Sequence, residues 1–123
     1  MFDDLSMQEK LRIVQELVPG KQITIAHIIA NPDDILYRKL GLDPAIDYKR
    51  TAIGIVTMSP AETAIIAGDI AIKSSGVELG FVDRFSGTLI VTGNVSDVQA
   101  SLTALVEYCR DVLSFTVCPI TKT

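Results

Sequence analysis

The chain has 123 residues, of which 48% are hydrophobic and 21% are charged, and its formal net charge is −4. This length fits one domain around a single packed core. Because the sequence has no Lys/Arg cluster and no run near the roughly 18 apolar residues of a spanning helix, it predicts neither nucleic-acid binding nor a membrane span.

The apolar fraction is high for a small domain, whose surface is large relative to its volume. One copy of the chain cannot bury all of this surface, so we predict a subunit interface. The acidic residues Asp3, Asp4 and Glu9 stand where a secretory signal needs a basic start and an apolar core, which predicts no export. Cys109 and Cys118 lack the spacing of a metal site or a redox pair, and we interpret them as reduced thiols of a cytosolic protein.

An isolated strand is predicted after residues 1–10, which show no clear periodicity. Apolar and polar residues alternate over 11–18, and one face carries Leu11, Ile13, Gln15 and Leu17. Pro19 and Gly20 separate this strand from the rest of the chain. A short lone strand leaves unpaired edges, so it must pair with the body of the domain or with copies of itself.

A second strand is predicted over 22–30, which is rich in isoleucine, and a short helix follows it. Asn31 is the expected N-cap and Pro32 the first helical residue, with acidic residues in the opening turn. Gly41 is expected to end the helix. Residues 42–50 are predicted to form a polar loop.

The next segment predicts a strand over 51–59 and a helix over 60–75. Ser59 is the expected N-cap, Glu62 its capping-box partner, and Gly76 the left-handed residue that ends the helix. Small or apolar residues cover almost the whole circumference of this helix, at Ala64, Ile65, Ala67, Gly68, Ala71 and Ile72. One face can pack on a sheet, and the other is predicted to contact a neighbouring chain.

A hairpin and the longest helix come next. The hairpin strands are predicted over 77–85 and 88–92, with a turn at Ser86 and Gly87. Over 95–113, apolar residues recur three or four apart and form one stripe of a helix. Ser96 and Gln99 are the expected capping box of this helix.

The element order from residue 51 onward is β-α-β-β-α, which is most of a ferredoxin-like βαββαβ unit. The last strand is missing after the long helix. The tail over 114–123 is expected to be extended in part, but it is a poor candidate for this strand because Pro119 limits its pairing. The strand over 22–30 can supply the missing member. We therefore predict an α+β domain with a circularly permuted βαββαβ order.

Six sequence runs carry a family resemblance: V-P-G-K-Q at 18–22, A-H-I-I-A-N-P at 26–32, A-I-G-I at 52–55, E-T-A-I-I-A-G-D at 62–69, G-F-V-D-R-F-S-G at 80–87 and C-P-I-T-K-T at 118–123. In this order, they resemble the permuted shell subunits of bacterial microcompartments of the ethanolamine- and propanediol-utilisation type. The resemblance covers roughly residues 13–123.

The resemblance implies a structural subunit that forms cyclic hexamers. Such hexamers tile into a protein shell around metabolic enzymes in the bacterial cytoplasm. The implied partners are other copies of the chain, other shell proteins and encapsulated enzymes. The implied organisation is an N-terminal extension at 1–10, a strand at 11–19 and a permuted shell domain at 22–123.

The resemblance also assigns residues to positions in the ring. The strand that carries Leu11, Ile13, Gln15 and Leu17 would join five copies in a six-stranded β-barrel over the central axis. The axial pore loop would consist of Asp83, Arg84, Phe85, Ser86 and Gly87. Lys73, Asn31 and Pro32 would lie at the edge where hexamers meet.

Two departures from the family pattern concern the shape of the ring and its periphery. The 42–50 loop and the head before Leu11 look longer than in the relatives. Thr51 stands where the ethanolamine-type relative has a glycine that is linked to a bent ring. A bend is therefore not implied for this chain.

Other interpretations of single residues stay open at the sequence level. Asp83 and Arg84 could form an anion-binding or catalytic pair, and Lys73 could be an ordinary solvated lysine. His27, the single histidine, has no neighbouring cysteine or second histidine, which disfavours a metal or general-base role. No catalytic, cofactor or metal site is predicted. The main alternative to a shell subunit is a ferredoxin-like regulatory module that binds a small molecule.

Overall fold

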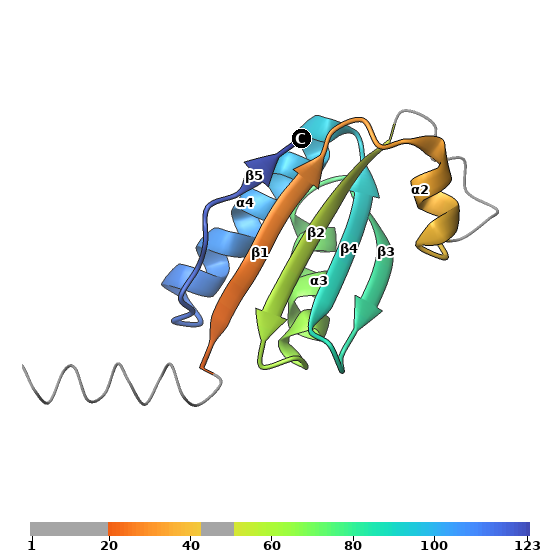
Figure 1. Ribbon diagram of the computed structural model, residues 1–123. Coiled ribbons are helices and arrows are strands. Elements are labelled where there is room, and N and C mark those ends of the chain that lie inside the picture. Colours follow the sequence, from red (N-terminus) through yellow and green to blue (C-terminus); the bar gives the residue numbers. More distant parts are fainter. Residues whose placement is uncertain (1–19, 43–50) are drawn as a thin grey trace, which may run out of the picture.

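The computed structural model describes residues 20–42 and 51–123, which form five strands and three helices (Figure 1). The strands are β1 (Gln22–Ile29), β2 (Ala52–Ser59), β3 (Glu78–Asp83), β4 (Thr88–Gly93) and β5 (Thr121–Lys122). The helices are α2 (Asp34–Lys39), α3 (Thr63–Ser74) and α4 (Val95–Asp111). The predicted strand at 11–18 lies outside the described residues.

All five strands belong to one sheet in the order β3-β4-β2-β1-β5. Neighbours are antiparallel except β1 and β5, which are parallel. β1 comes first in the chain, yet it pairs with β2 at the place that the last strand of a βαββαβ unit occupies. The predicted circular permutation is thus confirmed.

The main core lies between the sheet and the helices α3 and α4, which cover one face (Figure 1). Its fully buried side chains include Ile28, Val56, Leu89, Leu102, Leu105 and Cys109. Alternate residues of β2 point to this face because strand side chains alternate. Gly54 lets α4 approach closely: a Cβ there would lie 2.8 Å from Leu102 Cδ1 and 2.8 Å from Val98 Cγ1.

A smaller core covers one end of the opposite face. Tyr37 of α2 and Leu42 pack there against Ile53 and Ile90. The Tyr37 hydroxyl donates a hydrogen bond to the carbonyl of Thr51, which ties α2 to the start of β2. Burial, and secondarily the charge of Asp34, raises the pKa of Tyr37. The short helix α2 is therefore held by tertiary contacts, since six residues alone make a marginal helix.

The N-caps of all three helices differ from the sequence prediction, although α4 begins at Val95 as predicted. In α2 the N-cap is Asp33, whose side chain accepts from the Ile35 amide, and the predicted cap Asn31 and first residue Pro32 lie outside the helix. In α4 the N-cap is Asn94, whose Oδ1 accepts from the Asp97 amide and whose amide donates to Asp97 Oδ2. Ser96 donates to Asn94 instead of capping the helix itself.

The third difference concerns α3, which begins at Thr63 rather than Pro60. Ser59 cannot cap it because Ser59 is still part of β2 and pairs with Gln22. Glu62 takes the N-cap position without a side-chain hydrogen bond. The helix ends at Ser74, its C-cap Ser75 is extended, and Gly76 is not left-handed. In contrast, Gly41 follows the end of α2 with φ of 70°, as predicted.

The C-terminal tail, residues 114–123, lies along the outer edge of β1 and contributes the fifth strand, which the sequence did not predict (Figure 1). Thr116 pairs with Gln22, and Thr121 pairs with His27. The prediction that Pro119 limits the tail is correct for the middle of the segment, where residues 117–120 belong to no strand. This pairing depends on contacts between residues that are far apart in the sequence.

Candidate functional site

The turn between β3 and β4 contains all five residues predicted for a pore loop. Asp83 organises it: Oδ1 accepts from the Phe85 amide at 2.8 Å, and Oδ2 accepts from the Ser86 hydroxyl at 2.8 Å. The Gly87 amide donates to the Asp83 carbonyl at 2.9 Å. These bonds hold the turn in one conformation.

Gly87 fixes the turn against the end of β2. Its φ is 75°, and its carbonyl accepts from the Met58 amide at 2.8 Å. A Cβ at this position would lie 2.1 Å from the Met58 carbonyl oxygen, so no side chain fits here. The sequence signal Ser-Gly therefore marks a position that both conformation and space restrict to glycine.

The tip of the turn presents a cation on an aromatic ring. Arg84 Cζ lies 4.9 Å from the centroid of the Phe85 ring, and Phe85 is 81% exposed. Hydrogen bonds from the Phe85 amide, then from the Ser86 hydroxyl, lower the pKa of Asp83. The Asp83 carboxylate accepts hydrogen bonds from within the turn, so the structure does not support a catalytic pair of Asp83 with Arg84.

Lys73 lies in the last turn of α3 and is ion-paired with Asp69, Nζ to Oδ2 2.8 Å. The hydrogen bond to Asp69 raises the pKa of Lys73. Both side chains are exposed, at 73% and 61%. Asn31, also exposed, and the buried Pro32 follow the end of β1, which is antiparallel to β2. The helix α3 likewise runs opposite to β2, because it crosses from the end of β2 to the start of β3, and both strands are antiparallel to β4. The three predicted edge residues thus lie toward one end of the sheet.

Large apolar side chains remain exposed on the outer surface of this single chain. On α3, the inward positions are small and buried, whereas Ile65, Ile66 and Ile72 are 54%, 50% and 46% exposed. Leu79 and Phe81 of β3, Tyr108 of α4 and Val112 directly after it are also exposed. This agrees with the prediction that α3 has a second apolar face. Such a surface is typical of an interaction site.

His27 makes hydrogen bonds that hold the C-terminal tail against β1. Its Nδ1 lies 2.6 Å from the Thr121 hydroxyl, and its Nε2 lies 2.9 Å from the Thr123 hydroxyl. The ring therefore joins β1 to the C-terminal tail. In the part of the chain that the structure describes, no three His, Cys, Asp or Glu side chains are grouped to bind a metal ion.

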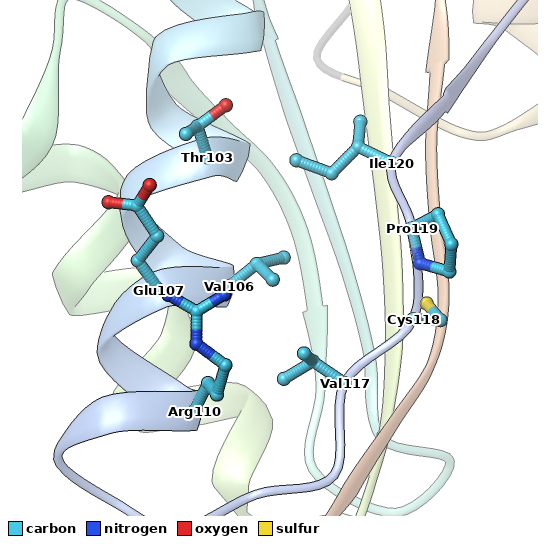
Figure 2. Close-up of a pocket in the computed structure, with 8 residues that line it drawn as sticks. All are labelled: Thr103, Val106, Glu107, Arg110, Val117, Cys118, Pro119 and Ile120. Carbon is cyan, nitrogen blue, oxygen red and sulfur yellow. The ribbon is translucent and has the colours of Figure 1, made fainter.

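The predicted barrel residues Leu11, Ile13, Gln15 and Leu17 lie outside the described residues, so their position stays a prediction. The sequence missed a groove of about 430 Å³ between α4 and the C-terminal tail (Figure 2). Its walls are Thr103, Val106, Glu107 and Arg110 on α4 and Val117, Cys118, Pro119 and Ile120 on the tail. Pro119 was the sequence signal that the tail leaves the sheet here.

Comparison with known proteins identifies the family. The family model of the BMC domain matches residues 52–121. The chain is 50% identical to the bacterial microcompartment shell protein PduU of Salmonella typhimurium over 91% of this chain and 93% of the relative. It is 47% identical to the shell protein EutS of Escherichia coli over 93% and 98% of the two chains. This chain belongs to the bacterial microcompartment shell proteins.

Solved structures of a relative agree with this assignment. The flat hexamer of CutR superposes with a TM-score of 0.79 at 44% identity, covering 86% of this chain and 94% of CutR. CutR has also been solved as a screw, with a TM-score of 0.75, and as a domain-swapped dimer, with a TM-score of 0.60. The relatives are shell proteins, so the comparisons do not favour the alternative interpretation as a regulatory module that binds a small molecule.

The match to the family model fits the permuted topology of this shell protein. The matched segment starts at β2 and reaches β5, so β1, which completes the sheet, lies outside it. Within residues 20–42 and 51–123, none of the helices combines the length and apolar character that a bilayer span requires.

Proposed function

We propose that this shell protein forms a cyclic hexamer that tiles with other shell proteins around metabolic enzymes. The observation that carries the proposal is the exposed apolar surface of α3, β3 and α4 on a fold that superposes on the CutR hexamer. A closed ring would bury such surface with one repeated contact. The protein would then act through interface geometry, without catalytic chemistry, in the microcompartment shell of the bacterial cytoplasm.

The turn over 83–87 is assigned to the axial pore loop in this proposal. Its rigidity supports the role, because a loop that is fixed by Asp83 and Gly87 presents the same surface in every subunit. Six copies would place six Arg84 and Phe85 side chains around the axis. The strand over 11–18 would form the barrel above them and narrow the pore, which makes this subunit a poor conduit for metabolites.

The α3 edge is assigned to contacts between hexamers. The Asp69–Lys73 pair is exposed between apolar side chains and can exchange partners with the same pair on a neighbouring ring. Asn31 and Pro32 would lie beside this contact. Both a flat and a non-planar ring are compatible with the proposal, since Thr51 replaces the glycine linked to bending and CutR adopts both flat and screw forms.

Native mass spectrometry of the full chain, and of a variant that lacks residues 1–18, tests this function. We expect a hexamer for the full chain and a weakened or altered assembly for the truncated one, because the barrel strand is gone. A stable monomer of the full chain at micromolar concentration would contradict the proposal. A crystallographic axis that is open and lined by residues 83–87 would contradict the narrowed pore alone.

A further inference from the structure

The tip of the 83–87 turn presents two exposed side chains that contact each other. Phe85 is 81% exposed, more than any other large apolar side chain of residues 20–42 and 51–123. Arg84 lies over the Phe85 ring and is ion-paired with no carboxylate of these residues. Arginine and aromatic residues are enriched in protein interfaces. We call this pair the turn platform, and its composition is that of a binding surface.

The turn platform has a backbone that is held in place before any partner binds. Asp83 accepts hydrogen bonds from the Phe85 amide and the Ser86 hydroxyl, and the Gly87 carbonyl accepts from the Met58 amide. Binding therefore orders two side chains and not the backbone, which lowers its entropic cost. Arg84 keeps its guanidinium N–H groups for a carboxylate from outside the turn.

The described part of the chain begins beside this platform. Ile23 pairs with Met58, and the Met58 amide donates to Gly87, so the start of β1 and the turn lie in one row across three adjacent strands. Neighbouring strands are about 4.8 Å apart, which places the two roughly 10 Å from each other. Figure 1 shows both at the same end of the sheet. The residues that precede 20 therefore join the domain within reach of the turn platform.

The segment over 11–18 has a second face that complements the platform. The odd-numbered residues form the face predicted for the barrel interior, so the even-numbered residues face outward. These outward residues are Arg12, Val14, Glu16 and Val18. Glu16 is the only acidic residue from 11 to 19, and Val18 follows it on the same face at about 7 Å. A carboxylate beside an apolar side chain complements a guanidinium beside an aromatic ring.

We propose that the turn platform is the seat of the N-terminal segment: Glu16 pairs with Arg84, and Val18 covers the Phe85 ring of the same chain. The inference rests on the proposed axial barrel, and it names the contact that holds each barrel strand to the body of its subunit. The contact removes an exposed aromatic ring from water and gives the guanidinium a charge-assisted hydrogen bond. Six such contacts would fix the barrel in one orientation over the ring.

Hydrogen exchange of the full-length assembled protein, followed by mass spectrometry, measures how firmly residues 11–18 are held. Arg84→Glu should lower the protection factors of these amides about fivefold, because it replaces an ion pair with two like charges; fivefold corresponds to roughly 1 kcal/mol at 25 °C. Phe85→Ala should lower them by a similar factor through the lost apolar contact. Exchange of the β4 amides should stay the same, which shows that the fold is intact.

A charge swap tests whether the two residues meet. Glu16→Arg should lower the protection factors as Arg84→Glu does, and the double variant should recover most of the loss. Arg38→Glu, which changes an exposed arginine of α2 at the other end of the sheet, is the matched control and should leave 11–18 unchanged. Additive losses in the double variant, or unchanged protection in Arg84→Glu, would overturn the proposal.

A cross-link distinguishes the same chain from a neighbouring one. Glu16→Cys with Arg84→Cys, in a Cys118→Ser background, is treated with a short bismaleimide, and the denatured chains are separated by size. Single chains with an internal cross-link are expected. Covalent dimers would assign the segment to the turn of a neighbour, and the absence of both products would show that the two positions lie apart. Either result would overturn the proposal.

An anion is the alternative occupant of Arg84, and inorganic phosphate is the probe for it. A rise in Tm with phosphate that Arg84→Glu abolishes, with unchanged protection of 11–18, would assign Arg84 to an anion and overturn the proposal. Native mass spectrometry of the same samples separates the seat from the ring. A hexamer whose 11–18 amides ignore the substitutions contradicts the seat alone, and a monomeric parent protein contradicts the ring.

Discussion

At the residue scale, two turn positions of this shell protein have a left-handed backbone conformation. Gly87 and Ser114 both have positive φ, but only the first is a glycine. At Gly87 the space itself forbids a side chain, because the Met58 carbonyl fills it. At Ser114, which is exposed, the side chain is tolerated at the cost of strain.

Ser114→Gly is expected to raise the free energy of unfolding by about 1 kcal/mol, because glycine adopts the left-handed conformation without that cost. Denaturant unfolding followed by circular dichroism would measure the change. Ser114→Ala keeps the strain and serves as the control, with little or no gain expected. Equal stabilisation by both substitutions would contradict the explanation.

Asp83→Ala is expected to destabilise the turn in a pH-dependent way. The folded pKa of Asp83 is lowered, so its stabilising contribution is present above the unfolded pKa, about 4, and is lost as the pH falls through the folded value. The difference in unfolding free energy between parent and variant should therefore shrink from pH 7 toward pH 3. A difference that is constant over this range would rule out the carboxylate as the cause.

At the element scale, the packing of α4 on β2 depends on a glycine in the strand. β2 is otherwise rich in β-branched residues, and Gly54 interrupts it where Val98 and Leu102 of α4 approach. On α3, Gly68 has a different environment, since a Cβ there would meet Leu79 and Val82 at an ordinary 3.5 Å. The two glycines predict opposite outcomes for the same substitution.

Gly54→Ala is expected to lower stability by about 1–3 kcal/mol, because overpacking would force α4 away from the sheet. Gly68→Ala is the matched control and should raise stability by about 0.5–1 kcal/mol, as alanine favours a helix interior. Thermal and denaturant unfolding of both variants would measure the two effects. Stabilisation by Gly54→Ala would contradict the close approach of α4.

At the scale of the whole molecule, the exposed edge of α3 and the rigid 83–87 turn have different roles in the proposed assembly. The turn would act within a ring, at its axis, whereas Lys73 would act between rings. The ion pair of Lys73 with Asp69 is exposed and contributes little to the stability of one chain. Its substitution can therefore report on assembly without unfolding the subunit.

Lys73→Ala is expected to leave the hexamer intact in native mass spectrometry and to reduce the formation of extended sheets, which electron microscopy would measure. Lys39→Ala, which removes an exposed lysine of α2, is the control and should leave the sheets unchanged. If Lys73→Ala forms sheets as readily as the parent protein, the lattice role of Lys73 is wrong. Loss of the hexamer itself would instead place Lys73 in the ring contact.

The sequence by itself determined the main strands, the two long helices, the permuted order and the hairpin turn. These follow from local patterns: alternation in β2, a three-to-four residue period in α4, and Ser-Gly at the turn. The small residues of α3 also indicated a surface that one copy leaves exposed. Periodicity carries this information because it records which face of each element is buried.

Only the tertiary structure decided the start of α3 and the course of the C-terminal tail. Ser59 looks like a cap, but its pairing with Gln22 keeps it in β2. The tail contributes a fifth strand because Thr121 pairs with His27, which lies 94 residues earlier and whose ring is hydrogen-bonded to the Thr121 hydroxyl. Such pairings join distant parts of the chain, and no local pattern in a ten-residue tail records them.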